Sequence, residues 1–295
     1  MIYDYIIAGS GIAGSICAYE LSRHNKSCLI LEKEQSRFEK ICGGGISYKA
    51  INILESIGIN VKEMINEKVS IINGHVVFNK DGCILKNYKP GVYSLGSTRY
   101  EFDSFLLNNA LKKGAIVKYN EKVTNISKEN DLYLVNGYKA HNFVCAVGAR
   151  GINKSIPKGQ SIGISAQIEG KPTLQPDKFY FWYYTDNDDK YFWIFPIGKN
   201  LWNIGVWFRN PDSTMKKDFY KGIDNYVKKY FKLGYKYRIP PKSDFLGNID
   251  QRSIGRNYYN GIGDFAGKNN IRNGGGIIGA IESALEYTAK ELNIL

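Results

Sequence analysis

The first residues that could do chemistry are six near the N-terminus that match the pattern GxGxxG: Gly9, Ser10, Gly11, Ile12, Ala13 and Gly14. A buried-strand pattern precedes them, a helical pattern follows over Ile12–His24, and a second strand pattern ends in Glu32. In this order the first glycine turns the chain, the second lets the backbone approach a pyrophosphate and the third lets helix and strand pack. The helix N-terminus would face the phosphates and Glu32 a ribose. We therefore predict a dinucleotide site here, in preference to a glycine-rich structural turn.

A second glycine run follows in the segment CGGGIS, which holds Cys42, Gly43 and Gly44. Three adjacent glycines cost backbone entropy unless a ligand needs the space. We predict that Cys42–Gly45 touch a flat or anionic group; a flexible loop is the alternative. A helix is predicted after it, over Tyr48–Ile57.

The C-terminal region carries a third signal. Gly263 and Asp264 follow a strand-like run, and Gly274, Gly275 and Gly276 open a predicted helix over Ile277–Leu292. Glycines at a helix start leave its backbone N–H groups accessible to negative charge. Two such helix starts in one chain suggest a single long ligand.

An aromatic segment stands apart from these loops. Tyr191, Trp193 and Phe195 alternate and end at Pro196, and Trp202, Gly205 and Trp207 follow. Alternation places the three rings on one face of a strand, so this face is either plain core or the wall of a pocket.

Elements that would position these residues can be read along the chain. Residues 69–98 have strand-like patterns, with predicted hairpin turns at Asn73-Gly74 and Asp81-Gly82. A helix is predicted over about 103–113 and short strands over 115–119, 122–127 and 131–135, after which NFVCAVGARG returns the chain to a parallel sheet. We predict an α/β fold in which a discontinuous Rossmann-like dinucleotide-binding domain (1–70, 98–155 and 250–295) is interleaved with an antiparallel-sheet domain (71–97 and 156–249).

Composition narrows the classes of function. The 295 residues carry a formal net charge of +12, which either favours an acidic partner or only reflects a composition with lysines scattered among many Asn, Ile and Tyr residues. No nucleic-acid motif is recognisable, so a nucleic-acid binder is not supported. A basic amphipathic helix predicted near 214–231 presents lysines that are either simply solvated or able to dock on an acidic protein or membrane surface. We expect at most peripheral membrane contact, because no run reaches the roughly 18 to 20 apolar residues of a membrane span.

Cysteines and histidines argue against metal chemistry. The five cysteines form no CxxC pair, and His24, His75 and His141 are isolated along the chain, so we predict no metal site and interpret the histidines as surface or satisfied residues. The N-terminus lacks the basic region of a signal peptide, and we expect a cytoplasmic protein.

Several segments in chain order resemble a known family. The N-terminal GxGxxG, STRYEFDSFLL (97–107), NFVCAVGARG (142–151) and GIGDFAG (261–267) are similar to FAD-dependent oxidoreductases of the aromatic-hydroxylase fold. Within that group CGGGIS, and YFWIFP followed by NIGVW, resemble the geranylgeranyl reductase family, whose pattern is YxWxFP followed by GxG. Here Gly205 matches the first glycine of GxG, and Trp207 replaces the second.

The resemblance implies roles for particular residues. It implies that the Gly9–Gly14 loop holds the FAD pyrophosphate, Glu32 and Lys33 lie at the ribose, and Asp264, next to Gly263, meets the ribityl chain. It also implies that Arg99 lies beside the flavin, that Val123 meets the adenine through its backbone, and that the pyrimidine side of the ring faces Gly275, Gly276 and Ile277. Cys42 corresponds to a family cysteine near the ring, as a contact or a proton donor, and the aromatic strand would wall a pocket for a hydrophobic substrate (Tyr191, Trp193, Phe195, Pro196, Gly205 and Trp207).

The resemblance leaves three functions open. The leading hypothesis is reduction of carbon–carbon double bonds of an isoprenoid or other hydrophobic substrate by hydride transfer from flavin N5. The alternative is a monooxygenase or halogenase acting on an aromatic or carrier-bound substrate, although halogenases show a Trp-x-Trp-x-Ile-Pro pattern that Tyr191 and Phe195 depart from. A non-catalytic flavin-binding protein is the third. Because Val147 stands where relatives carry an aspartate associated with nicotinamide, we expect an acidic ferredoxin-type or flavodoxin-type protein as electron donor.

Overall fold

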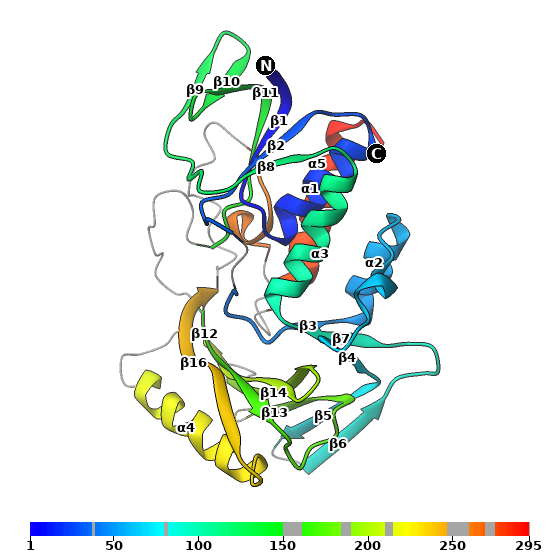
Figure 1. Cartoon of the computed structure of the whole chain (residues 1–295), viewed down its shortest axis with the longest axis vertical. Helices are drawn as coiled ribbons and strands as arrows, with labels where there is room; N and C mark the ends of the chain where they lie inside the picture. The colour runs from blue at the N-terminus through cyan, green and yellow to red at the C-terminus, as the bar shows by residue number, and fades with distance from the viewer. Residues whose placement is uncertain are drawn as a thin grey trace.

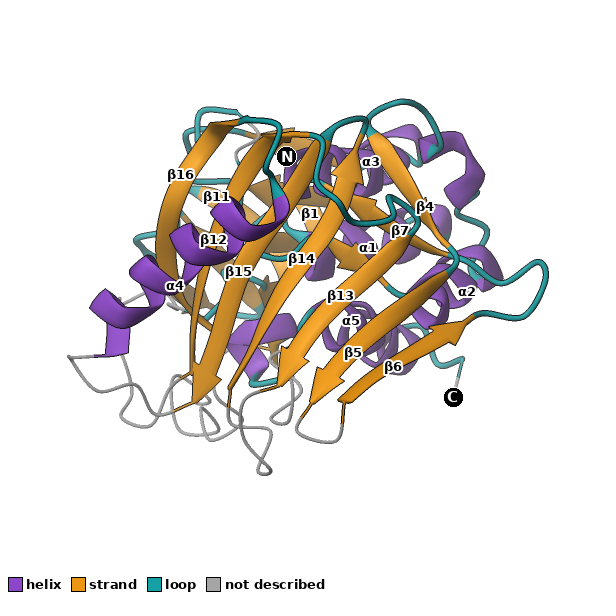
Figure 2. Ribbon diagram, turned by 90° about the horizontal axis from the view of Figure 1, so that it is seen from below, coloured by secondary structure: helices purple, strands orange, loops and turns teal. Residues whose placement is uncertain are grey.

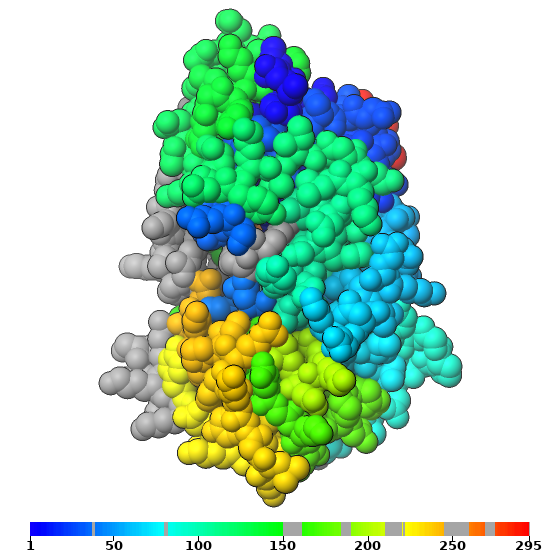
Figure 3. Space-filling view, viewed as in Figure 1, coloured from blue at the N-terminus to red at the C-terminus, as the bar shows by residue number. Residues whose placement is uncertain are grey.

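The protein folds into two sheet-based parts that lie one above the other (Figure 1). The structure is a computed structural model that describes residues 1–36, 39–79, 82–149, 161–183, 190–209, 215–246, 260–268 and 275–294. In the space-filling view, the green β8–β11 region forms the top of one face, and the yellow and orange α4 and β16 the bottom (Figure 3).

The upper part is built on a mainly parallel sheet. Its central strand β1 (Ile2–Ala8) pairs in parallel with β2 on one side and β11 on the other. The remaining strands extend this centre, with β8 and β17 parallel and the β9–β10 hairpin antiparallel. The bounds are β2 Cys28–Leu31, β8 Ile116–Lys118, β9 Ile126–Glu129, β10 Leu132–Val135, β11 Tyr138–Cys145 and β17 Asn260–Gly261.

Three helices form a layer beside this sheet: α1 (Ile12–Arg23), α3 (Arg99–Lys112) and α5 (Ile277–Glu291) (Figure 1). Helix α1 contacts both α3 and α5, and its residues from Ile12 to Ser22 are all buried. This burial explains why α1 lacks a polar face, since a helix enclosed on every side has no solvent-facing side to mark. Helix α2 (Tyr48–Ser56) packs against α5.

The lower part is a sheet in the strand order β16-β12-β15-β14-β13-β5-β6. All its neighbours are antiparallel except β5 and β13. Helix α4 (Met215–Tyr230) lies across its outer face (Figure 2). The strand bounds are β5 Gly74–Asn79, β6 Gly82–Asn87, β12 Ser161–Gly170, β13 Lys178–Tyr183, β14 Lys190–Gly198, β15 Leu201–Arg209 and β16 Tyr235–Leu246.

Strand β14 divides its side chains between the two faces of this sheet. Phe192 and Ile194 belong to the cluster that packs under α4. Trp193 and Phe195 belong to a separate cluster on the opposite face, with Tyr191 packed against it. The period-two alternation therefore produces two apolar faces rather than one apolar and one polar face.

A small sheet and two 3-10 helices complete the described elements. The sheet joins β3 (Gly45–Ile46), β7 (Ser94–Ser97) and β4 (Val69–Ile72). The 3-10 helices are η1 (Val61–Met64) and η3 (Gly263–Ala266). Among the described residues, no helix is both long and apolar enough to cross a membrane.

The hairpin predicted at Asn73-Gly74 is wrong. Strand β4 pairs with β7 and β5 pairs with β6 and β13, so the chain passes here from one sheet into another. Neither residue adopts the positive φ that a tight hairpin turn needs. Gly74 instead lies close to β6, because a Cβ there would overlap the Lys86 carbonyl oxygen.

Other local predictions agree more closely. Strands β5 and β6 form an antiparallel pair up to Asn79 and Gly82, and Asp81 of the predicted turn lies outside the described residues. The helix predicted from residue 103 begins at Arg99, since Thr98 caps it by accepting a hydrogen bond from the Glu101 N–H. The domain limits stay a prediction.

Candidate functional site

The Gly9–Gly14 loop is tight at two glycines and open at the third. A Cβ on Gly9 (φ +98°) would lie 2.6 Å from the Ala146 carbonyl oxygen, and one on Gly14 would overlap the Gly9 carbonyl oxygen. A Cβ on Gly11 would have nothing within 4 Å. Gly11 also precedes α1, whose start has no side-chain cap. The loop thus leaves space at the position where a pyrophosphate would approach the helix N-terminus.

Glu32 holds this loop from the end of β2. Its Oε2 accepts hydrogen bonds from the Ser10 N–H (2.9 Å) and hydroxyl (2.7 Å), and its Oε1 accepts one from the Glu34 N–H (3.1 Å). A carboxylate has acceptor positions beyond these three, so a ribose hydroxyl can still be bound. Lys33 lies on the surface and pairs with Glu34, and Val123 is buried among residues of the parallel sheet.

Gly263 and Asp264 lie at the start of η3, close to the same loop. The Gly263 N–H donates to Ser283 Oγ of α5 (2.9 Å), and a Cβ on Gly263 would lie 2.9 Å from the Ala13 Cβ. Gly263 therefore lets η3 pack directly on the start of α1. The carboxylate of Asp264 pairs with Lys40 across 3.5 Å.

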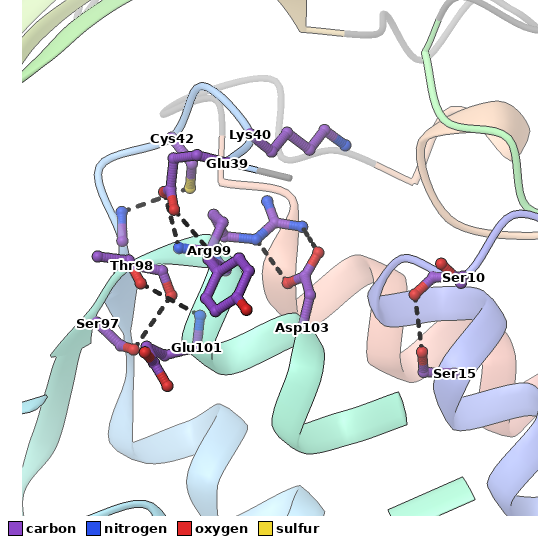
Figure 4. A network of polar contacts seen from close by, with 12 residues as sticks. Ser10, Ser15, Glu39, Lys40, Cys42, Ser97, Thr98, Arg99, Glu101 and Asp103 are labelled. Atoms are coloured by element: carbon purple, nitrogen blue, oxygen red, sulfur yellow. Dashed lines mark hydrogen bonds and ion pairs between the residues drawn. The ribbon is translucent and has the colours of Figure 1, made fainter. Parts of the chain in front are cut away.

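Arg99 lies in a buried polar network at the start of α3 (Figure 4). Its Nε and Nη2 each donate to Asp103 at 2.8 Å. Burial opposes the charge of Arg99, but the Asp103 carboxylate and the neighbouring Cys42 outweigh it and raise the pKa of the guanidinium. Glu39 accepts hydrogen bonds from the Arg99 and Tyr100 N–H groups (2.9 and 3.1 Å), and its own pKa is raised because it is buried. This network attaches the segment that leads to Cys42 to the helix start.

The glycines after Cys42 are packed against the protein itself. A Cβ on Gly43 would lie 3.0 Å from the Phe195 ring, and one on Gly45 would lie 3.3 Å from the rings of Phe179 and Phe195. Gly44 has a φ of +74°, and its Cβ would overlap the Ser97 carbonyl oxygen. Aromatic rings of the protein itself therefore occupy the space beside Gly43 and Gly45, and contact of this loop with a ligand stays a prediction.

Those rings form rows across the inner face of the lower sheet. Tyr191 lies between Tyr183 and Trp207, Trp193 between Phe181 and Gly205, and Phe195 beside Asn203. Gly205 makes room for a ring, because a Cβ there would overlap the Trp193 indole. The ring centroids of Tyr191 and Trp207 are 5.6 Å apart, and those of Phe179 and Phe195 are 4.4 Å apart.

A cavity of about 820 Å³ lies between this aromatic face, the Cys42 loop and the start of α5. The predicted cofactor residues on its wall are Cys42, Gly43, Gly44, Gly275, Gly276 and Ile277, and the predicted substrate residues there are Tyr191, Trp193, Phe195 and Trp207. The wall includes neither Pro196 nor Gly205, nor the predicted residues at the dinucleotide end, Gly9–Gly14, Glu32, Lys33, Arg99, Val123, Gly263 and Asp264.

Gly276 and Trp207 both line this cavity. Gly276 is the N-cap residue of α5, and no side chain caps the helix there by a hydrogen bond. Gly274 lies outside the described residues. Trp207 is 1% exposed, and its indole N–H has no acceptor within the described part of the chain.

Several residues of the cavity and its surroundings were not predicted from the sequence. His75 lines the cavity, and its pKa is lowered by burial and by Lys86. Phe179 and Phe181 extend the aromatic face, and the alternation in KFYFWY could have indicated them. Asn203, an isolated polar residue in an apolar strand, could also have been found. The contact of Glu39 with α3 joins segments far apart in the chain, and no local pattern indicates it.

Comparisons with known proteins find relatives of the kind that the sequence resemblance predicted. A family model described as an NAD(P)-binding Rossmann-like domain matches residues 7–38. The chain is 25% identical to a digeranylgeranylglycerophospholipid reductase of Methanosarcina acetivorans, over 96% of this chain and 73% of that protein. The solved structure of a geranylgeranyl bacteriochlorophyll reductase-like protein from Thermoplasma acidophilum superposes with a TM-score of 0.77 and 18% identity, over 99% of this chain and 79% of that one.

A flavin-dependent brominase, Bmp2, is equally similar in fold. Its TM-score is 0.77 at 19% identity, over 100% of this chain and 79% of the brominase. These comparisons confirm the predicted fold class, the resemblance to geranylgeranyl reductases and the prediction of an FAD-dependent oxidoreductase. They do not distinguish a reductase from a halogenase, since likeness of fold is compatible with both chemistries.

Proposed function

We propose that this FAD-dependent oxidoreductase, similar to geranylgeranyl reductases, saturates carbon–carbon double bonds of an isoprenoid or another hydrophobic chain. One observation carries the proposal. A single cavity of about 820 Å³ is walled on one side by predicted flavin contacts and on the other by the aromatic face predicted for the substrate. A ligand in that cavity would lie between the two groups of residues that the reaction has to bring together.

The residues present fit FAD. Gly11 would admit the pyrophosphate, Glu32 would accept from the ribose, and Asp264 would meet the ribityl chain. When bound, FAD supplies the hydride through its N5 atom. The N-terminus of α5, at Gly276 and Ile277, would stabilise negative charge on the pyrimidine side of the reduced ring.

The aromatic wall suits an apolar chain. Phe181, Tyr191, Trp193 and Phe195 offer large apolar surfaces, and burial of each methylene of a substrate contributes about 0.8 kcal/mol without requiring a polar partner. The relative from Methanosarcina acetivorans is named for a substrate with geranylgeranyl chains, which supports this class. Cys42, whose half-buried thiol lies on the same wall, would either contact the ring or hold a proton at Sγ.

An acidic protein is the proposed electron donor. Val147 occupies the position at which relatives carry an aspartate linked to nicotinamide, and the net charge of +12 would attract an acidic ferredoxin-type or flavodoxin-type protein. We propose that the enzyme works in the cytoplasm. Stopped-flow reduction under anaerobic conditions separates the donors, and rapid, saturable reduction by NADPH alone would reject this part of the proposal.

Oxygen chemistry is the second candidate, because the brominase shares the fold with the same TM-score as the reductase-like protein. Tyr191 and Phe195 depart from the halogenase pattern and count against it. Incubation of the reduced protein with oxygen and bromide or chloride, with and without phenolic acceptors, would reveal halogenation or hydroxylation.

The deciding experiment starts from purified protein. We expect one FAD per chain and a yellow colour, and the dithionite-reduced protein should be reoxidised anaerobically by geranylgeraniol or a geranylgeranyl lipid with formation of the saturated product. Protein that neither contains nor binds FAD would reject the cofactor, and a bound flavin that no alkene reoxidises would reject the reductase.

A further inference from the structure

Asn203 joins the two walls of the cavity although it is absent from both predicted sets of site residues. It lies in β15, is 2% exposed, and pairs with Phe195 of β14 in the antiparallel register. Its Oδ1 accepts a hydrogen bond from Trp193 Nε1 (2.8 Å), and its Nδ2 donates one to the Cys42 carbonyl oxygen (2.8 Å). One amide therefore links the aromatic strand to the Cys42 loop.

Only a side chain with both a donor and an acceptor satisfies this arrangement. The indole N–H can only donate and the backbone carbonyl can only accept, so the two ends of the Asn203 amide are assigned without ambiguity. A leucine would leave both groups unpaired, and an aspartate would lose the bond to Cys42. A buried amide that satisfies two groups at once is costly to replace.

Its partners are restrained from other directions as well. The Trp193 indole lies over Gly205, which has no side chain to displace it, and a Cβ on Gly43 would lie 3.1 Å from Trp193 Nε1. The Cys42 segment is attached at its other end to α3 through Glu39. Asn203 is thus a hydrogen-bonded contact between this loop and the sheet side of the cavity.

We infer that Asn203 is a positioning residue that holds the Trp193 ring and the Cys42 loop at a fixed separation. Its effect on catalysis rests on the proposed function, because that function places the substrate against Trp193 and the flavin against the loop. Its effect on the loop itself does not depend on the reaction.

Thiol accessibility tests the loop directly. In a Cys83→Ser background, Cys42 is the one cysteine that is not buried, and its reaction with 5,5′-dithiobis(2-nitrobenzoate) reports how often the loop opens. We expect Asn203→Leu and Asn203→Asp to raise the labelling rate by about 10-fold or more, because both lose the donor to the Cys42 carbonyl. The matched control is Asn142→Leu, which removes another strand asparagine that donates to a backbone carbonyl, that of Asp4 (3.3 Å).

A second measurement needs no substitution at Asn203. The indole N–H of Trp193, assigned by its loss in Trp193→Phe, should exchange slowly with D₂O in the unmodified protein. An unchanged labelling rate in both Asn203 variants, or rapid exchange of this indole, would overturn the inference.

Turnover separates the inference from the proposed function. At saturating FAD, Asn203→Leu should lower kcat by about 10-fold or more, because the Trp193 ring and the Cys42 loop are no longer held at a fixed separation. Faster Cys42 labelling in a protein whose wild type reduces no alkene would reject the reductase and leave the positioning role intact. Faster labelling with unchanged kcat in an active enzyme would reject the catalytic part of the inference.

Discussion

Two of the glycine-rich loops, Gly9–Gly14 and Cys42–Gly45, differ in the atoms that surround their glycines. In the Gly9–Gly14 loop, Gly11 has open space where a Cβ would be, while Gly9 and Gly14 are held against nearby backbone. In the Cys42–Gly45 loop every glycine meets the protein: Gly43 and Gly45 meet aromatic rings, and Gly44 meets the Ser97 carbonyl oxygen. The first loop leaves room for a ligand, and the second uses its glycines to pack on the sheet.

This difference shows how much can be inferred from a run of glycines in a sequence. A glycine indicates that something approaches the backbone closely, but the sequence does not identify the approaching group. At Gly11 no atom of the described residues lies within 4 Å of a Cβ, which leaves the space that the predicted approach of a pyrophosphate requires. At Gly43 the neighbouring rings are sufficient to explain why the residue is a glycine. A cofactor would meet the other side of this loop, the side that lines the cavity.

The largest effect on stability is expected when Trp193, whose ring packs against the Cys42–Gly45 loop, is removed. Trp193→Ala should destabilise the protein by about 3 to 5 kcal/mol, because a buried indole is lost and the Asn203 amide loses a partner. FAD should stay bound, since the Gly9–Gly14 loop does not touch this ring, while turnover is lost or redirected. Urea unfolding and flavin absorbance of the purified variant measure the two effects.

The matched control for this change is Trp202→Ala. Trp202 is equally buried in β15 but faces the α4 side, where its ring meets Phe231. Trp202→Ala should lower the free energy of unfolding by a similar amount to Trp193→Ala, and the protein that stays folded should keep its turnover. Equal activity in a folded, flavin-loaded Trp193→Ala protein would contradict a role of this ring in the cavity.

Gly44→Ala should have the next largest effect, a decrease of about 2 to 5 kcal/mol in the free energy of unfolding. The residue would have to keep a left-handed backbone, and its Cβ would meet the Ser97 carbonyl oxygen, which is rigid backbone. Gly91→Ala separates the two causes, because Gly91 has a φ of +81° with nothing within 4 Å. If both variants lose the same stability in urea, the contact with Ser97 contributes nothing.

Gly11→Ala should separate ligand binding from stability. With a φ of −68° and no atom near the new Cβ, the apo protein should keep its stability within about 1 kcal/mol. FAD affinity should fall by about 10-fold or more, equivalent to at least about 1.4 kcal/mol, because the methyl group occupies the approach of the pyrophosphate. Titration of the apo protein with FAD measures this, and unchanged affinity would mean that the open space at Gly11 is not the cofactor site.

Sequence patterns predicted the parts of the site that depend on local order. The strand, glycines, helix and Glu32 follow one another within one βαβ unit, so their spacing was enough to predict the dinucleotide loop. Alternation likewise indicated that Tyr191, Trp193 and Phe195 share one face of a strand. The contacts of Asn203 with Cys42 and of Glu39 with α3 join distant segments, and no periodicity reports such pairs. The hairpin predicted at Asn73-Gly74 was wrong for the same reason, because the tertiary structure determines which sheet each strand joins.

The smallest effect should come from Gly43→Ala, which tests the ring contact alone. Its Cβ would lie 3.0 Å from the Phe195 ring, a contact that a small shift of that ring can relieve, so we expect a loss of about 1 kcal/mol. Phe195→Leu removes the ring edge, and in that background the same change should cost less, because only the contact with Trp193 Nε1 (3.1 Å) remains. A double-mutant cycle in urea measures the coupling between the two positions. If Gly43→Ala costs the same in both backgrounds, the glycine is not there to accommodate Phe195, and the ligand on the side of the loop that lines the cavity becomes the better explanation for it.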